Sequence, residues 1–403
     1  MSAEGPRVVH VVYECVPGEF RGGVQKACLE LASAQAALGV AVEIWAVDAV
    51  RQGTEARLPT TGASVRIRWF AGERTAGNLR SRAIGRALAT EPGVAAVHGH
   101  NTFHTLNLQI GRAARQRGLP AFYHPHGALD PGLFPGWSLK SAKKRAWNAV
   151  AEIPNLSRAA GVVALTPLEA EQLRAIGVRA PIHVIPNGIR PPADATSGAR
   201  ATFRARHGIA ADAPVLLFIG RLVEKKRVEW LIDALASERL RGAVGVIAGN
   251  RAQEPAYTAA LDARAASLGD RLKWVGFLDE VTKPDAFAAA DVFVHASTSE
   301  GMAMAILEAM AAGLPTVVSR GCYMADAAAA GAVRQVDTLD GFIEALAELL
   351  GDRTAADALG EAGRAHARSV HDWGAVAARV LDVYEAAGAD LGRGQRADKP
   401  IPG

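Results

Sequence analysis

Cysteine is scarce in this chain of 403 residues, which contains only Cys15, Cys28 and Cys322. An odd number of cysteines at such wide separations excludes a disulfide framework and gives no metal-ligand spacing. This usage is typical of a reducing compartment, so we expect a cytoplasmic protein. No run of about 18 apolar residues occurs, and no cationic segment precedes an apolar one at the N-terminus. The sequence therefore predicts neither a transmembrane helix nor a signal peptide.

Several motifs for nucleotides and metals are also missing. The chain has no G-x-G-x-x-G fingerprint and no G-x-x-x-x-G-K-[ST] loop, which disfavours a dinucleotide-binding enzyme or a P-loop nucleotidase. It has no D-x-D pair and no H-E-x-x-H motif, so we expect no metal and no cofactor. The 45 basic and 41 acidic residues give a net charge of +4. So small a surplus does not indicate nucleic-acid binding, but it suits a small anionic ligand.

The composition indicates a folded chain of two domains. Hydrophobic residues make up 49% of the sequence, which excludes a disordered protein, and the length suits two domains of ordinary size. Short apolar runs such as VVHVVY and VLLFI alternate with helical patterns in both halves, which predicts two α/β domains with parallel sheets. We place the N-terminal domain at residues 1–190, a linker at 191–213 and the C-terminal domain at 214–371. A last helix is expected at 372–388 and a disordered tail at 389–403.

The segment HASTSEGMAMAILEAMAAG carries two glutamates that follow a predicted strand. Glu300 falls in the loop after the strand, and Glu308 lies about two turns into the next helix. The free N–H groups of Gly301, Met302 and Ala303 at the helix start suit a sugar hydroxyl or a phosphate. Alternatively, Glu300 is a carboxylate at a helix start and Glu308 an ordinary helical residue.

Two cations follow another predicted strand in the same half. Arg221 and Lys226, in GRLVEKKR, would suit a diphosphate, with a bidentate fork from the arginine and a point charge from the lysine. Such fixed cations would stabilise a leaving diphosphate where no carboxylates hold Mg²⁺. The alternative is a solvated basic turn, which is what most charge runs are.

The N-terminal half offers two candidate groups. Gly22 and Gly23 lie between the first strand and the first helix, where paired glycines let the backbone approach a ligand. Five histidines follow apolar runs: His98, His100, His104, His124 and His126. We interpret His98, His104 and His124 as polar residues at strand ends, and His126 as the best functional candidate.

Taken together, these segments resemble the family 4 glycosyltransferases from Val8 to about Ala387. The resemblance rests on GGVQKACLELA, HPHGALDP, VIPNGI, GRLVEKK, VGFL and the SEG…LEAMAAGLPTVVS block. It implies the GT-B fold of two facing Rossmann-like domains with a cleft between them, and a last helix that crosses back to the N-terminal domain. The implied reaction is metal-independent and retains anomeric configuration.

The resemblance also implies roles for individual residues, with His126, Glu300, Arg221 and Lys226 at the catalytic site. Arg221 and Lys226 would bind the donor diphosphate, and Gly22 and Gly23 would approach it from the N-terminal domain. Glu308 would bind the ribose, and Phe277 and Leu278 the base. Glu300 and the amides of Gly301, Met302 and Ala303 would hold the sugar, against which His126 would lie. The family often has glycine at Arg227 and Phe-Gly at Met302-Ala303, so the sugar pocket is expected to differ in shape.

The predicted function is transfer of a hexose from a UDP- or GDP-linked donor to a hydroxyl acceptor, in cell-surface polysaccharide or glycolipid assembly. The basic segment Lys140–Arg145, flanked by Trp137 and Trp147, is either a peripheral contact with the inner face of the membrane, which would suit a lipid-linked acceptor, or a solvated helix face. The alternatives are a transferase with a small-molecule acceptor, a sugar-nucleotide epimerase of the same fold and an inactive sugar-nucleotide-binding module.

Overall fold

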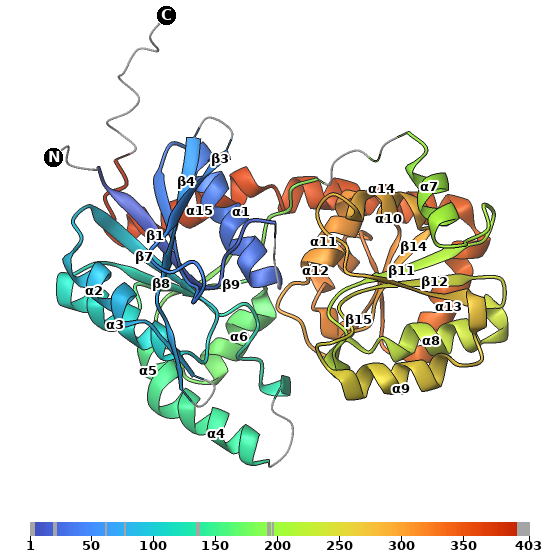
Figure 1. Cartoon of the computed structure of the whole chain (residues 1–403), viewed down its shortest axis with the longest axis horizontal. Helices are drawn as coiled ribbons and strands as arrows, with labels where there is room; N and C mark the ends of the chain where they lie inside the picture. The colour runs from blue at the N-terminus through green and yellow to red at the C-terminus, as the bar shows by residue number, and fades with distance from the viewer. Residues whose placement is uncertain are drawn as a thin grey trace, which may run out of the picture. The chain divides into compact units, whose positions relative to one another are not determined.

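The computed structural model describes residues 5–18, 22–60, 63–75, 78–133, 138–191, 195 and 197–392. The chain forms two compact units (Figure 1). The first contains the chain up to Gly188 and again from Trp373, and the second contains Ile189–Asp372. Each unit is an α/β structure built on a largely parallel sheet, which confirms the predicted fold class.

The first unit is built on an eight-stranded sheet in the order β10-β9-β8-β7-β1-β2-β4-β3. The strands are β1 (Arg7–Tyr13), β2 (Ala41–Val47), β3 (Glu55–Thr60), β4 (Ala63–Phe70), β7 (Val94–His100), β8 (Ala121–His124), β9 (Gly161–Ala164) and β10 (Ile182–Val184). Among these described strands, only β3 and β4 pair antiparallel. A separate hairpin contains β5 (Glu73–Thr75) and β6 (Asn78–Arg80).

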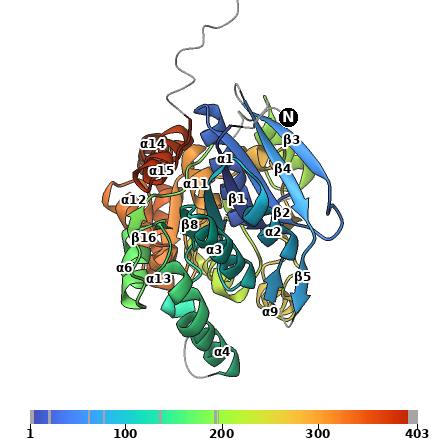
Figure 2. The same ribbon diagram turned by 90° about the vertical axis from the view of Figure 1, so that its left-hand side faces the viewer.

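Side chains alternate between the two faces of this sheet, as the strand period requires. Val9, Val11 and Val97 point to the face covered by α2 (Arg82–Thr90) and α3 (Thr105–Arg117), which Figure 2 shows in front of the sheet. The intervening residues point to the face covered by α1 (Gly23–Ala37) and α15 (Trp373–Ala386), which contact each other. The remaining helical segments are α4 (Leu139–Trp147), α5 (Ile153–Leu156), α6 (Pro167–Ala175), η1 (Pro131–Leu133) and the π-helix η2 (Asn148–Glu152).

The C-terminal end of the chain belongs to the first unit. Trp373 donates its Nε1–H to Glu30 of α1 at 2.7 Å, and Val380, Leu381 and Tyr384 of α15 are buried. Ala389 and Leu391 are buried as well. The prediction of a disordered tail from residue 389 is therefore wrong for 389–392, because these apolar side chains pack on the unit. Residues 393–403 lie outside the described residues.

The second unit contains a six-stranded parallel sheet in the order β13-β12-β11-β14-β15-β16. The strands are β11 (Val215–Ile219), β12 (Val244–Ala248), β13 (Leu272–Gly276), β14 (Val292–His295), β15 (Thr316–Ser319) and β16 (Arg334–Val336). The helices are α7 (Ala199–Arg206), α8 (Glu229–Ala236), α9 (Pro255–Ala265), α10 (Lys283–Ala289), α11 (Met304–Ala311), α12 (Ala325–Ala329), α13 (Leu339–Gly351) and α14 (Arg353–Val370), with short turns η3 (Glu224–Lys226), η4 (Glu238–Leu240), η5 (Gly269–Arg271) and η6 (Arg320–Cys322).

The segment predicted as a linker, residues 191–213, contains a structural helix of the second unit. Helix α7 packs against α10, and its Arg204 is buried with 2% exposed surface. The Arg204 guanidinium donates to the carbonyl oxygens of Ala213 and Ala289 and to the carboxylate of Asp291. The middle of the predicted linker is therefore a helix, while its described residues before 199 and after 206 form turns and irregular structure. The Pro- and Ala-rich composition of this segment did not indicate the helix, which Arg204 holds in place through these hydrogen bonds.

Candidate functional site

The donor candidates of the second unit lie where the strand order reverses. The chain runs from β11 to β12 on one side and returns to β14 on the other, so the loops after β11 and β14 diverge at the carboxyl edge. Ligands of open α/β sheets bind at such a switch point. Arg221 and Lys226 follow β11, and Glu300 follows β14. The amide of Thr298 donates to the carbonyl oxygen of Lys225 at 2.8 Å and ties the two loops together.

Lys226 and Glu300 form a buried ion pair. The Lys226 Nζ lies 2.6 Å from the Glu300 Oε1, and each residue is 7% exposed. Ser297 donates its hydroxyl to the same carboxylate oxygen. Burial alone would raise the pKa of Glu300, but the Lys226 ammonium holds it well below the usual range. The carboxylate is therefore charged, and it fixes the ammonium at the strand edge.

His295, the last residue of β14, contacts both members of this pair. Its Nε2 is 3.2 Å from the Lys226 Nζ, so the ammonium can donate to the neutral ring. Burial, and then the charge of Lys226, lowers the pKa of His295 to about 4. By contrast, Arg221 is exposed, and its guanidinium makes no hydrogen bond or ion pair within the described part of the chain. Lys226 is thus engaged within the unit, whereas the guanidinium of Arg221 is available to a ligand.

Glu308 and the residues before it form the start of α11. This helix begins at Met304 with Ala303 as its N-cap, so Glu308 lies one turn into the helix rather than the predicted two. Its carboxylate accepts from the Lys283 Nζ of α10 at 2.8 Å. No side chain caps the first N–H groups of α11. Gly301 and Met302 are half-buried just ahead of these groups.

The predicted base-binding residues follow β13 at the edge of the sheet. Gly276 ends this strand with a left-handed φ of 75°, and Phe277 comes next with 63% of its surface exposed. Leu278 is half-buried. An exposed aromatic ring at a strand end can stack on a planar base.

In the first unit, Gly22 and Gly23 begin helix α1. Gly22 is the N-cap with an extended φ of −172°, and no side chain caps the helix. A Cβ on Gly22 would lie 3.2 Å from the Gln25 Oε1, and Gly23 is exposed. Among the described residues no side chain caps the first amides of α1, and the extended φ of Gly22 is one that other residues also adopt.

His126 follows β8 in a strained conformation. Its φ is +56° and that of Gly127 is +74°, which places a non-glycine residue in the left-handed region. The Glu169 carboxylate accepts from the amide of Gly127 at 2.6 Å and from that of Leu165 at 2.7 Å. Glu169 therefore holds the backbone of the loop that carries His126. Strain of this kind persists where surrounding contacts determine the conformation, and it is common at functional sites.

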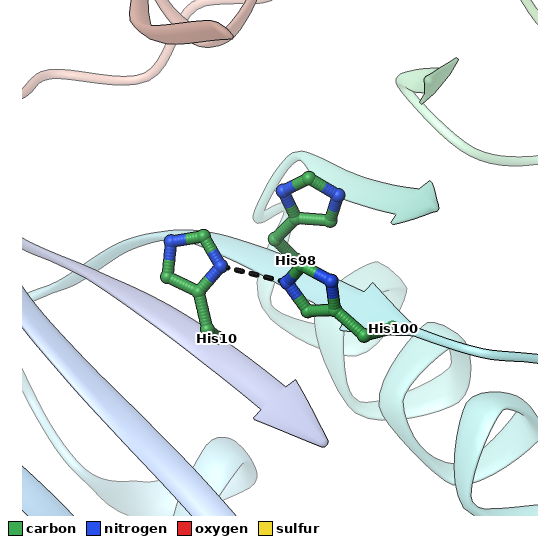
Figure 3. Close-up of side chains that lie close together, drawn as sticks. All are labelled: His10, His98 and His100. Atoms are coloured by element: carbon green, nitrogen blue, oxygen red, sulfur yellow. Dashed lines mark hydrogen bonds between the residues drawn. The ribbon is translucent and has the colours of Figure 1, made fainter. Parts of the chain in front are cut away.

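The histidines lie side by side at the β1–β7 switch point of the first sheet. His10 pairs with His98 across β1 and β7, and His100 pairs with His124 across β7 and β8. All four side chains are buried on the face covered by α1 and α15, and Figure 3 shows three of them together. The His126 ring stacks on that of His124 with centroids 3.9 Å apart.

The interpretation of three histidines as polar caps of strand ends is only partly correct. His98 lies within β7, is fully buried and bonds through Nδ1 to the hydroxyl of Tyr384. His124 ends β8 but is buried, and its two ring nitrogens have no hydrogen-bond partner among the residues that the structure describes. His104 begins α3 as its N-cap. The prediction failed for His98 because burial on one sheet face depends on tertiary packing.

Two groups of these rings bring three ring nitrogens within 4.8 Å of one another: His10 with His98 and His100, and His100 with His124 and His126. Neutral imidazoles are good transition-metal ligands. However, His10 Nδ1 lies 2.9 Å from His100 Nε2, and His100 Nδ1 lies 3.1 Å from His126 Nε2. These are hydrogen-bond separations, and each contact occupies the nitrogens with a shared proton. The prediction that the enzyme needs no metal stays a prediction.

The sequence did not reveal several residues of these sites, among them His10, Glu169, Lys283 and His295. Glu169 could have been found from the sequence, because it ends a T-x-x-E pattern that marks a helix start. The Thr166 hydroxyl caps α6 by accepting from the amide of Glu169. The other three contact their partners only through strand register or helix packing, which spacing along the chain does not reveal.

Comparisons with known proteins agree with this geometry. The family described as "Glycosyl transferase 4-like domain" matches residues 22–188, and "Glycosyl transferases group 1" matches residues 199–366. The D-inositol 3-phosphate glycosyltransferase 2 of Catenulispora acidiphila is 30% identical, over 79% of this chain and 75% of that protein. The D-inositol 3-phosphate glycosyltransferase of Xylanimonas cellulosilytica is 29% identical, over 95% and 97%. The chain belongs to the family 4 glycosyltransferases.

The fold of this glycosyltransferase is GT-B. A structure of Anabaena HepE in complex with UDP and glucose superposes with a TM-score of 0.73, at 18% identity over 94% of this chain and 100% of that one. The protein is a hexosyltransferase that uses nucleotide-sugar donors. The predictions of family, fold and enzyme class are confirmed. No helix in the described part of the chain combines the length and apolar character needed to cross a bilayer.

The buried ion pair of this transferase leads to a prediction about stability. Lys226→Ala should lower the free energy of unfolding by about 3 kcal/mol without nucleotide, because it leaves the Glu300 carboxylate buried and unpaired. The double variant Lys226→Ala/Glu300→Gln should lose much less. Urea denaturation measures both, and Lys225→Ala is the control for charge. Equal losses in the single and double variants would contradict the coupling.

Glu169 should make stability depend on pH. Burial raises the pKa of this carboxyl to about 7 from an ordinary 4.5, although two amides donate to it. The folded protein therefore retains a proton that the unfolded chain releases above pH 4.5, so this contribution to stability is lost as the pH rises from 4.5 to 7. Relative to Glu169→Gln, the wild type should lose about 3 kcal/mol across this range. The exposed Glu171→Gln should show no such difference, and parallel curves for wild type and Glu169→Gln would refute the assignment.

Proposed function

We propose that the protein transfers a hexose from UDP or GDP to a hydroxyl acceptor with retention of anomeric configuration. The observation that supports the donor half is the arrangement at the β11–β14 switch point. There an exposed Arg221 lies in the same loop as a Lys226 whose position is fixed by Glu300 and Ser297. Cations held in place before the reaction stabilise charge that develops on a leaving diphosphate.

In this proposal the residues that contact the nucleotide sugar bind it and form no covalent bond with it. Arg221 and Lys226 bind the diphosphate, Glu308 binds the ribose hydroxyls, and Phe277 and Leu278 contact the base. Glu300 and the amides of Gly301, Met302 and Ala303 hold the sugar. The diphosphate leaves as the acceptor oxygen attacks the same face of the sugar. No protein nucleophile is assigned.

His126 and the start of α1 are the proposed contributions of the first unit. His126 lies against the donor sugar, and the amides at Gly22 and Gly23 approach the diphosphate. Burial lowers the pKa of His126 to about 3, so its ring is neutral at neutral pH. A neutral imidazole can accept a hydrogen bond from a sugar hydroxyl, whereas an imidazolium cannot.

We propose that the acceptor is carried at an anionic membrane surface, as in glycolipid or cell-surface polysaccharide assembly. The support is helix α4, which lies apart from the sheet in both views (Figures 1 and 2). Leu139 is 74% exposed and Val150 is 77% exposed, and Lys143 and Arg145 are exposed between them. Exposed apolar side chains interspersed with cations, here along α4 and the following η2, suit a helical segment that lies on a lipid surface.

The structure modifies the expected membrane surface. The Lys144 Nζ lies 4.9 Å from the centroid of the Phe103 ring, and Trp147 donates to Glu152 at 3.1 Å. These two side chains are therefore engaged within the unit. Trp137 lies outside the described residues. The proposed contact thus depends on the side chains that the structure shows as exposed: Leu139, Lys143, Arg145 and Val150.

A second candidate acceptor is a small soluble polyol phosphate. It is favoured by the names of the two relatives, which specify D-inositol 3-phosphate. Such an acceptor would need no contact between α4 and lipid.

Diphosphate binding is tested with Arg221→Ala. The variant should bind UDP or GDP about tenfold more weakly in titration calorimetry, because a charge-assisted hydrogen bond is lost. Binding of the corresponding nucleoside should not change. Arg227→Ala removes the same charge, but that guanidinium lies over the Trp230 ring, so the variant should bind normally. Unchanged diphosphate binding by Arg221→Ala would refute the donor assignment.

Membrane contact is tested by sedimentation with vesicles. The wild type should bind vesicles that contain anionic phospholipid, and Lys143→Glu/Arg145→Glu should bind at least tenfold more weakly, since each cation near the surface is worth about 1 kcal/mol. Arg86→Glu/Arg112→Glu changes the charge equally on α2 and α3 and should bind as the wild type does. Absence of vesicle binding, together with glycosylation of D-inositol 3-phosphate, would replace the first acceptor by the second.

A further inference from the structure

Three histidines and one glutamine form a continuous chain of hydrogen bonds through the interior of the first unit. Gln35 of α1 places its Oε1 2.7 Å from the His10 Nε2. The His10 Nδ1 lies 2.9 Å from the His100 Nε2, the contact dashed in Figure 3. The His100 Nδ1 lies 3.1 Å from the His126 Nε2. The chain thus runs from a helix, across β1 and β7, to the loop after β8.

The direction of every bond in this chain follows from the side of the Gln35 amide that faces His10, which the structure gives as Oε1, together with the proton count. A carbonyl oxygen such as Gln35 Oε1 only accepts, so the His10 Nε2 must carry the proton. A neutral imidazole has one N–H, so the His10 Nδ1 accepts and the His100 Nε2 donates. By the same reasoning the His100 Nδ1 accepts and the His126 Nε2 donates. The His126 Nδ1 is left with a lone pair.

The neutrality that this count requires is supported by burial. His10 and His100 have 0% and 3% of their surface exposed. Burial lowers the pKa of His10 to about 4 and that of His100 well below its usual range. A second proton on His10 or His100 would also place two N–H groups against each other. The chain therefore has a single arrangement of protons as long as the Gln35 oxygen accepts at its end.

We propose that Gln35, His10 and His100 are positioning residues that fix His126 in the Nε2–H tautomer and direct its Nδ1 lone pair to a substrate hydroxyl. The ring cannot rotate freely, because His124 stacks on its face at 3.9 Å and Glu169 holds the adjacent backbone. Orientation and tautomer are both set by groups behind the ring. The value of this arrangement for catalysis rests on the proposed function, in which His126 lies against the donor sugar.

The tautomer is read directly from two-bond ¹⁵N–¹H correlation spectra of protein labelled in histidine, with His126 assigned by comparison with His126→Asn. The wild type should show His126 with its proton on Nε2. Gln35→Met removes the acceptor at similar volume, so the chain loses its direction and a fraction of His126 should move to the Nδ1–H form. His10→Phe breaks the chain one step later and should do the same. His124→Phe keeps the stacked ring, removes no bond of the chain and should leave the tautomer unchanged.

Kinetic measurements then distinguish a role of Gln35 in positioning His126 from a role in stabilising the fold. Gln35→Met should lower kcat/KM in step with the fraction of His126 found in the Nδ1–H form, about tenfold where that fraction reaches nine-tenths, because His126 in that form no longer accepts the hydrogen bond. His126→Asn retains an acceptor near the Nδ1 position independently of the chain, so adding Gln35→Met to that variant should cause no further loss. Circular dichroism and thermal melts establish that each variant is folded, and His10→Phe replaces Gln35→Met if the latter does not fold.

Two results would overturn the proposal: an Nδ1–H tautomer of His126 in the wild type, or an unchanged tautomer in both folded Gln35→Met and His10→Phe. An additional tenfold loss from Gln35→Met in the His126→Asn background would show that Gln35 acts only on structure. Failure of the proposed function would look different. The spectra would still show the Nε2–H tautomer, while the wild type would transfer no sugar from UDP or GDP donors.

Discussion

The reversal of strand order within each parallel sheet is the constraint on which the rest of this structure depends. Where β11 lies beside β14, and β1 beside β7, the connections leave in opposite directions, and the carboxyl edge between them has no crossing loop. In the second unit this edge carries Lys226 and Glu300, and in the first it carries His100, His124 and His126, with His10 and His98 further back within their strands. Each candidate group is assembled from segments far apart in the sequence because adjacent strands bring their ends together.

Both groups bury polar side chains, and the cost of removing those side chains from water determines which of them are charged and which are neutral. A buried charge must be paired, so Lys226 and Glu300 fix each other, and His295 beside them stays neutral. Buried imidazoles avoid the cost by losing their charge, after which hydrogen bonds alone decide where each proton lies. The second unit therefore presents a fixed cation, and in the proposed tautomer the first unit presents a fixed lone pair. The two groups meet the cost of burial differently: Lys226 and Glu300 keep their charges as a pair, whereas the histidines stay neutral.

Sequence reasoning identified local features and missed tertiary ones. The two α/β units, the loops after β11 and β14 and the candidate residues Arg221, Lys226 and Glu300 were all accessible from apolar runs and loop position. The partners of those residues were not. His10 appears in the sequence as one polar residue in an apolar strand, and only the register of β1 against β7 places it beside His98. Similarly, Lys283 meets Glu308 through the approach of α10 to α11.

Backbone strain shows why the residues of these loops cannot be judged by type alone. Arg227 has a φ of +46°, a conformation that costs a side chain roughly 1 kcal/mol and explains why the family often has glycine there. The arginine recovers part of that cost by placing its guanidinium 5.2 Å from the centroid of the Trp230 ring. His126 is strained in the same way but is held by Glu169 and His100. At Arg227 the strain is thus partly offset by a neighbouring ring on the same loop and helix. At His126 the strain is instead maintained by two contacts, one that holds its backbone and one that holds its ring.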